Sequence, residues 1–295
     1  MDSSKKSVFI DVLIILLLLI ISLCGVTSFN TKNAYEAVNQ YGEVIKIWGS
    51  GVYAHDSFFK SPIFIGTDFT GLLVTLPLLL AIILRRSKTV SIEYEVRMFA
   101  LMSILLYYSA SICFGVTYNY LHLLYIVLFG LVFYRTASLF LNLHAAGVKN
   151  PNICTFHTSK GMRVFLVISG ISLFVAWLPD IITSLINKKT LDLIEVYTTE
   201  VTYILDMGII SPLMFIALYL SKRENFIGYV LLRMIFLICM LVGIMLPIQT
   251  AFQIAADINI PLPALITKVF IFVILAVFSF VFNSRLKKET KYSEE

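Results

Sequence analysis

The sequence predicts an all-α protein that crosses a membrane several times, and three observations carry this prediction. Hydrophobic residues make up 59% of the 295-residue chain, charged residues make up only 14%, and several apolar stretches are long. Soluble domains carry about 25% charged residues, so this chain could not cover a surface that faces water. The mean hydropathy of +0.88 agrees. The composition excludes a disordered chain, a disulfide scaffold and a typical nucleic-acid-binding protein.

Eight stretches meet the requirement for a transmembrane helix, which is about 20 mostly apolar residues. They cover residues 8–28, 64–84, 97–118, 121–143, 164–186, 201–221, 227–250 and 264–284. Only Asn119 and Tyr120 separate the third stretch from the fourth, which predicts a tight helical hairpin. We interpret residues 1–295 as a single integral membrane domain, a polytopic bundle of about eight spans.

The distribution of basic residues predicts the orientation of the bundle, because cytoplasmic loops are enriched in Lys and Arg. With the N-terminus in the cytoplasm, fifteen basic residues fall in cytoplasmic segments and five in extracytoplasmic segments. The five are Lys32, Lys46, Lys60, Lys188 and Lys189. We therefore expect both termini in the cytoplasm and residues 29–63 outside, as a long loop after the first helix. The expected location is the cytoplasmic membrane of a prokaryote.

The loop at 29–63 contains aromatic residues of the kind that favour the headgroup region. They are Tyr35, Tyr41, Trp48 and Tyr53. Part of residues 33–48 has the composition of an interfacial helix, while an ordered loop that caps the bundle fits the same residues.

Ionisable residues within the spans fall in two layers. Asp68, Asp180, Asp206 and Lys268 lie four to six residues from the outer ends of their helices, so they should share a depth of roughly 6–9 Å below the boundary. Such residues are costly in a bilayer and are therefore candidates for a ligand or ion site. A structural role, in which each Asp caps a helix or bonds to the neighbouring backbone, fits the same positions. Three carboxylates face one ammonium group, which indicates a protonated Asp, a bound cation or access to water. We expect at least two of these acids to approach each other or Lys268.

An inner layer contains Asp11, Arg135 and Arg233, and the membrane centre between the layers carries no charged side chain. A path through the centre would have to use neutral polar groups. The candidates are Thr75, Ser103, Tyr107, Ser109, Ser172, Ser211 and Gln249. Prolines 77, 179, 212 and 247 interrupt four spans, as broken helices do in transporters.

The sequence predicts no metal site and no cofactor. Cys154 and His157 form a lone C-x-x-H, with His144 nearby, whereas tetrahedral zinc needs four ligands. A Gly-rich phosphate-binding motif is also missing from the sequence, so ATP-driven work by this chain alone is not expected.

Residues from about 53 to 143 carry a motif order in which Asp56-Ser57 precedes Gly66-Thr67-Asp68, followed by Leu76-Pro77 and then by Tyr118-Asn119 between two helices. This order resembles a group of bacterial and archaeal multi-pass membrane proteins with no assigned activity. The resemblance implies no function. It adds Asp56, Tyr118 and Asn119 to the candidate residues, all on the outer face of the predicted topology.

Three classes of function remain open. The first is transport, or the handling of an ion or small solute, at a site on the outer face. The second is a membrane-embedded transferase acting at that face, with Glu36, Glu43 or Asp56 as its acidic residue. The third is a non-catalytic sensor or assembly subunit. The bilayer is the expected partner, nucleic acid is not, and both the ligand and the oligomeric state stay open.

Overall fold

A computed structural model describes residues 3–86, 91–260 and 262–292, without the side chains of residues 3–6, 264, 267 and 268. The α-helices are α1 (Ser3–Val26), α2 (Ser61–Thr70), α3 (Leu76–Leu84), α4 (Ile92–Gly115), α5 (His122–Lys149), α6 (Lys160–Asn187), α7 (Val201–Leu205), α8 (Ser211–Lys222), α9 (Phe226–Ala255), α10 (Leu262–Leu265) and α11 (Ile271–Glu289). Three π-helical turns join some of them, η2 (Gly71–Thr75), η3 (Asp206–Ile210) and η4 (Ile266–Phe270), and η1 (Gly51–Tyr53) is a 3₁₀ turn. The short strands are β1 (Tyr35–Val38), β2 (Val44–Ile47), β3 (Cys154–Thr155) and β4 (Lys291–Tyr292).

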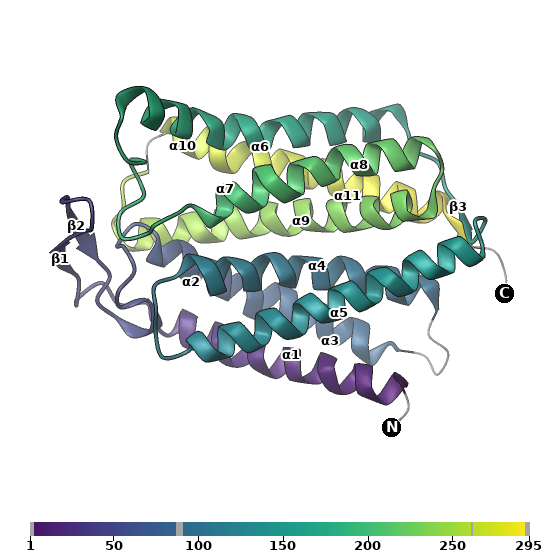
Figure 1. Ribbon diagram of the computed structural model, residues 1–295, viewed down its shortest axis with the longest axis horizontal. Coiled ribbons are helices and arrows are strands. Elements are labelled where there is room, and N and C mark those ends of the chain that lie inside the picture. Colours follow the sequence, from purple (N-terminus) through teal and green to yellow (C-terminus); the bar gives the residue numbers. More distant parts are fainter. Residues whose placement is uncertain (1–2, 87–90, 261, 293–295) are drawn as a thin grey trace.

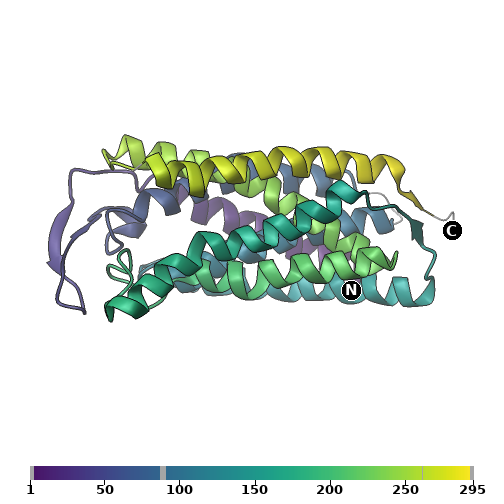
Figure 2. The same cartoon turned by 90° about the horizontal axis from the view of Figure 1, so that it is seen from above.

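The all-α transmembrane bundle predicted from composition is confirmed. Seven helical stretches of the described chain are long and apolar enough to cross a membrane: α1, α2–η2–α3, α4, α5, α6, α7–η3–α8 and α9. The eighth predicted span corresponds to α10, η4 and α11, which run along the bundle beside α9 (Figure 2). It is not among the seven, so the eighth crossing stays a prediction.

Helix α9 lies at the centre of the bundle and packs against α2, α4, α8 and α11 (Figure 1). Two glycines allow these close contacts. A Cβ atom on Gly66 of α2 would lie 2.6 Å from the Cα atom of Gln249, and one on Gly243 of α9 would collide with Ala276 of α11. Small residues let transmembrane helices approach until their backbones touch, so these positions fix how α9 seats between its neighbours.

Two of the predicted helix interruptions take the form of π-helical turns. The backbone N–H of Leu76 donates to the carbonyl of Gly71, and that of Ser211 donates to the carbonyl of Asp206, each five residues back. Pro77 is the second residue after the first turn, and Pro212 is the second residue after the other. Proline cannot donate to the helical ladder, so the wide turn accommodates the missing bond. Single π turns of this kind are frequent at functional sites.

The expectation of an interfacial helix within residues 33–48 is wrong, because this segment forms a β-hairpin. Strands β1 and β2 pair antiparallel, with Tyr35 opposite Ile47. The side-chain oxygen of Asn39 accepts hydrogen bonds from the N–H groups of Tyr41 and Glu43, and Gly42 supplies a positive φ of 83°. This local turn chemistry competes with helix formation, and it outweighs the weak helical pattern. We call this end of the bundle the hairpin end.

At the opposite end of the bundle, the inner charges form a buried ion pair. The guanidinium group of Arg135 donates to both carboxylate oxygens of Asp11, at 2.7 and 3.0 Å. Such two-point pairing fixes geometry as well as charge. The pair joins α5 to α1, so these two residues stabilise the packing of the N-terminal helices.

Candidate functional site

A cavity of about 350 Å³ lies within the bundle, between the helices that precede residue 150 and those that follow it. Its walls come from α1, α2–η2, α4, α6, α7–η3–α8, α9 and η4–α11. It extends from Glu200 at the hairpin end to Met214 of α8, a separation of about 20 Å along a helix. The cavity therefore reaches well into a hydrocarbon core that is about 30 Å thick.

The polar and apolar parts of the cavity lie at different depths. Polar side chains gather at the hairpin end, where Gln249 donates to the hydroxyl of Thr67 at 2.7 Å. The deeper wall is apolar and includes Ile238, Leu241 and Leu275. Of the neutral groups predicted for a central path, Thr75, Tyr107 and Gln249 line this cavity. Ser169 also lines the cavity, and its buried hydroxyl has no hydrogen-bond partner among the described residues.

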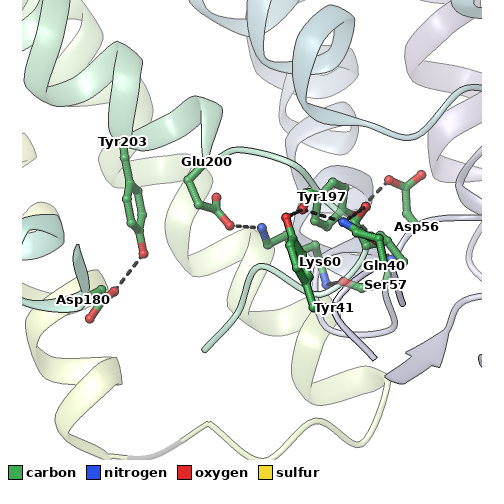
Figure 3. Close-up of polar contacts among 10 residues, drawn as sticks. Gln40, Tyr41, Asp56, Ser57, Lys60, Asp180, Tyr197, Glu200 and Tyr203 are labelled. Carbon is green, nitrogen blue, oxygen red and sulfur yellow. Dashed lines mark hydrogen bonds and ion pairs between the residues drawn. The ribbon is translucent and has the colours of Figure 1, made fainter. Parts of the chain in front are cut away.

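An ion pair between Lys60 and Glu200 stands at the polar end of the cavity (Figure 3). The Lys60 ammonium group also lies 4.2 Å from the centre of the Tyr197 ring. Lys60 precedes α2 and Glu200 precedes α7, so the pair bridges two segments that are far apart in the sequence. These contacts place one positive and one negative charge at the entrance to the apolar part.

Asp206 is the one predicted acid whose side chain is part of the described cavity wall. It begins the π turn η3 and is 8% exposed. One carboxylate oxygen accepts from the hydroxyl of Tyr107 at 2.9 Å, and the other accepts from the indole N–H of Trp177 at 2.8 Å. Both donors line the cavity too. The carboxylate is therefore held in place by neutral donors.

Asp68 lies one layer behind the cavity wall and is fully buried. It accepts hydrogen bonds from the hydroxyl groups of Tyr108, at 2.6 Å, and Tyr53. A Cβ atom on Gly25 of α1 would collide with the Asp68 carboxylate, so α1 closes over it. Asp180 has a similar partner, because it accepts from the hydroxyl of Tyr203 at 2.8 Å (Figure 3).

Asp56 joins three loops at the hairpin end. Its carboxylate accepts from the N–H and the hydroxyl of Thr117, each at 2.9 Å. It also accepts from the hydroxyl of Tyr197 at 2.9 Å (Figure 3). Thr117 belongs to the turn between α4 and α5, and Tyr197 belongs to the segment between α6 and α7. Asp56 is fully buried, so this acid of the first loop has no exposed surface with which to meet a substrate.

The β-hairpin adds to the same junction. Gln40 donates to the carbonyl of Tyr197 at 3.1 Å, and Tyr41 donates to that carbonyl at 3.2 Å. Asn39 donates to the carbonyl of Glu195 at 2.8 Å. The hairpin therefore holds the segment that carries Tyr197, one of the residues of the cavity wall.

The Tyr118-Asn119 turn lies next to this junction through Thr117. Asn119 is buried, and its side-chain oxygen accepts from the N–H of Leu121 at 2.9 Å. Tyr118 is 78% exposed. Neither lines the cavity in the described part of the chain. Asn119 thus shapes the α4–α5 turn, which in turn presents Thr117 to Asp56.

One arrangement recurs in all four acids. Each accepts a hydrogen bond from a tyrosine that lines the cavity: Asp56 from Tyr197, Asp68 from Tyr108, Asp180 from Tyr203 and Asp206 from Tyr107. Neutral donors complete the bonding of three of them, because Asp56 also accepts from Thr117, Asp68 from Tyr53 and Asp206 from Trp177. The predicted pairing with Lys268 falls on a side chain outside the description.

Most of these partners carry no recognisable signal in the sequence. Tyr108, Tyr197, Tyr203 and Trp177 were not singled out, because the chain has 15 tyrosines and no spacing rule connects a donor to an acid on another helix. An excess of membrane carboxylates over cations is a usable signal that neutral donors must be present. It does not identify them.

Comparisons with known proteins add no assignment to this geometry. A scan against protein-family models, a search of curated proteins and a search of solved structures each returned no match. Within the described residues, no group of three or more His, Cys, Asp and Glu side chains is placed to hold a metal ion.

Burial raises the pKa of Asp56 to about 7, although the bonds from Thr117 and Tyr197 and the charge of Lys60 act in the opposite direction. Between the ordinary value of about 4 and about 7 the folded protein therefore binds more protons than the unfolded chain, and stability falls as the pH rises. We expect the melting temperature in detergent to fall from pH 4.5 to pH 7.5. Asp56→Asn should flatten this dependence, and Asp192→Asn, at an exposed acid of the same end, should keep it. An Asp56→Asn variant with the full wild-type slope would contradict the assignment.

Asp68→Asn tests whether the second buried acid is structural. An amide in place of the carboxylate loses the charge-assisted bonds to Tyr53 and Tyr108, which should cost about 1–3 kcal/mol and lower the melting temperature in detergent. Asp192→Asn is again the matched control. A stable Asp68→Asn protein would show that the two tyrosines do not depend on the charge, and stability combined with a loss of ligand binding would place Asp68 in the functional site.

Proposed function

We propose that this multi-pass membrane protein binds an amphipathic small molecule in the cavity, and that it transports or otherwise handles this solute at the hairpin end. The observation that carries the proposal is a single cavity that is polar at the hairpin end and apolar about 20 Å deeper. A ligand with a polar group and an apolar body would match both parts at once.

The size and lining of the cavity support binding rather than simple loose packing. Ligand pockets measure about 300–1,000 Å³ and are mostly apolar, with a few polar groups that fix orientation. Protein interiors otherwise contain few voids larger than a water molecule. Here about 350 Å³ is left between seven helical segments, and Lys60, Asp206 and Gln249 supply the polar groups.

The cavity wall also contains the points where the helices are least regular. Gly71 and Thr75 of η2 and Asp206 and Ile210 of η3 are all lining residues. A π turn followed by proline has fewer regular hydrogen bonds than an α-helix, so the wall can bend there at low cost. Movement at these two turns would open or close the cavity, which favours transport among the functions that the sequence left open.

We place the hairpin end on the extracytoplasmic side of a prokaryotic cytoplasmic membrane, with eight spans and both termini inside. The support is the ratio of fifteen to five basic residues between the two sides. The motif order from about residue 53 to residue 143 favours a bacterial or archaeal membrane.

Cysteine labelling in intact cells tests this orientation. In a background without the four native cysteines, Glu36→Cys on β1 should react with a membrane-impermeant maleimide. Asn152→Cys at the opposite end should react only after the cells are opened. Both positions are exposed, so accessibility reports the side of the membrane. Labelling of Asn152→Cys in intact cells would contradict this orientation.

Filling the cavity tests the binding function. Val242 of α9 lines the cavity, whereas Ile244 on the same helix is 43% exposed and does not line it. A photoreactive alkyl amphiphile with a diazirine in its chain should label cavity residues such as Cys239 and Met245 in a saturable manner. Val242→Trp should reduce this labelling at least fivefold because the indole ring occupies the space, and Ile244→Trp should not.

The labelling pattern, read by mass spectrometry of the purified protein, decides the outcome. Adducts confined to exposed residues would contradict the proposal, as would a cavity adduct that Val242→Trp leaves unchanged. Melting temperatures of both tryptophan variants confirm that they are folded before the comparison is made.

A further inference from the structure

We infer that the cavity selects an amphipathic organic cation, a bulky apolar molecule with one positive charge, and that Asp206 binds its charged group. This inference rests on the proposed function, because it names the class of ligand that the cavity takes. It goes beyond that function in assigning the charge of the ligand and the residue that recognises it.

Few charged residues line the described part of the cavity wall. Lys60, Glu200 and Asp206 are the only residues with formal charges among the described lining residues. Lys60 and Glu200 neutralise each other in an ion pair. The remaining charge of the described wall is therefore the carboxylate of Asp206.

Asp206 lies between the polar and the apolar parts of the cavity. It lies six residues after Glu200 in the sequence, past the ion pair and at the border of the apolar part of the cavity. No basic side chain of the described chain forms an ion pair with it. A carboxylate in such surroundings is costly unless a cation or donors compensate for the lost water.

The hydrogen bonds of Asp206 leave part of its acceptor capacity available. Tyr107 and Trp177 each donate one bond, one to each carboxylate oxygen. An ionised carboxylate has about four acceptor positions, so two remain for a ligand. The two donors hold the carboxylate in a fixed direction without cancelling its charge, which is the arrangement that suits recognition of a cation.

Aromatic rings around Asp206 favour the same ligand. Tyr107, Trp177 and Tyr203 all line the cavity, and the rings of Trp177 and Tyr203 stack with their centres 4.7 Å apart. Aromatic faces attract cations, and organic ammonium groups are commonly recognised in this way. An anion would meet both the carboxylate and these electron-rich faces, so the wall discriminates by charge.

A pair of ions that differ in charge but little in shape tests the inference. Purified wild-type protein in dodecyl maltoside is dialysed against radiolabelled tetraphenylphosphonium and, separately, against tetraphenylborate. We expect saturable binding of the phosphonium ion and at least tenfold weaker binding of the borate. Asp206→Asn should weaken phosphonium binding at least tenfold and leave borate binding unchanged or stronger. Asp192→Asn, at an exposed acid outside the cavity lining, should bind like the wild type.

The results distinguish a failure of the cation preference from a failure of the proposed binding function. Equal binding of the two ions, or a preference for the borate, would overturn the inference without any variant, so the test does not depend on the folding of Asp206→Asn. Binding of either ion that Val242→Trp abolishes would still support the cavity as a binding site. If neither ion binds and the photoreactive amphiphile also fails to label the cavity, the proposed function fails as well.

Discussion

A carboxylate inside a bilayer needs hydrogen-bond donors, because no water is present in the hydrocarbon core to supply them. In this bundle tyrosine hydroxyl groups supply most of these bonds, and the packing at the hairpin end depends on them. Tyr107 and Tyr108 show how the geometry works. As neighbours on α4 they point about 100° apart around the helix axis, so one reaches Asp206 of η3 and the other reaches Asp68 of α2. Helix α4 is thereby tied to segments from both parts of the chain.

The same bonds determine the shape of the cavity. Phenol rings are large and apolar apart from one hydroxyl group, so each ring forms wall surface while its hydroxyl satisfies an acid behind or beside it. Asp68 and Asp56 are removed from the lining in this way, and Asp206 remains within it. Among the described lining residues, Asp206 is thus the one carboxylate outside an ion pair, although the sequence places several acids at similar depth. This selection connects the structural role of the tyrosines to the proposed choice of a cationic ligand.

The junction around Asp56 joins this wall to the outer loops. Tyr197 is bonded to Asp56, contacts the hairpin through its backbone carbonyl, and lines the cavity. A ligand that displaces the Tyr197 ring would therefore act on the hairpin and on the α4–α5 turn together. The hairpin packs onto the loop between α6 and α7, which borders the cavity.

Composition and the length of apolar stretches determined the fold class and seven of the helices, because a bilayer imposes strict requirements on every spanning segment. Pro77 and Pro212 also indicated where two helices would be irregular. The interruptions expected at Pro179 and Pro247 are wrong, because α6 and α9 continue through these prolines. The sequence did not determine which acids face the cavity or which tyrosines bind them, because Asp206 and Tyr107 are 99 residues apart and meet only through helix packing. The hairpin at 35–47 was missed for a related reason, since the turn at Asn39 is local chemistry that a search for helical spans does not weigh. Only the tertiary structure decided that Asp206 lines the cavity while Asp56 and Asp68 are buried outside its lining, because these positions depend on how the helices pack.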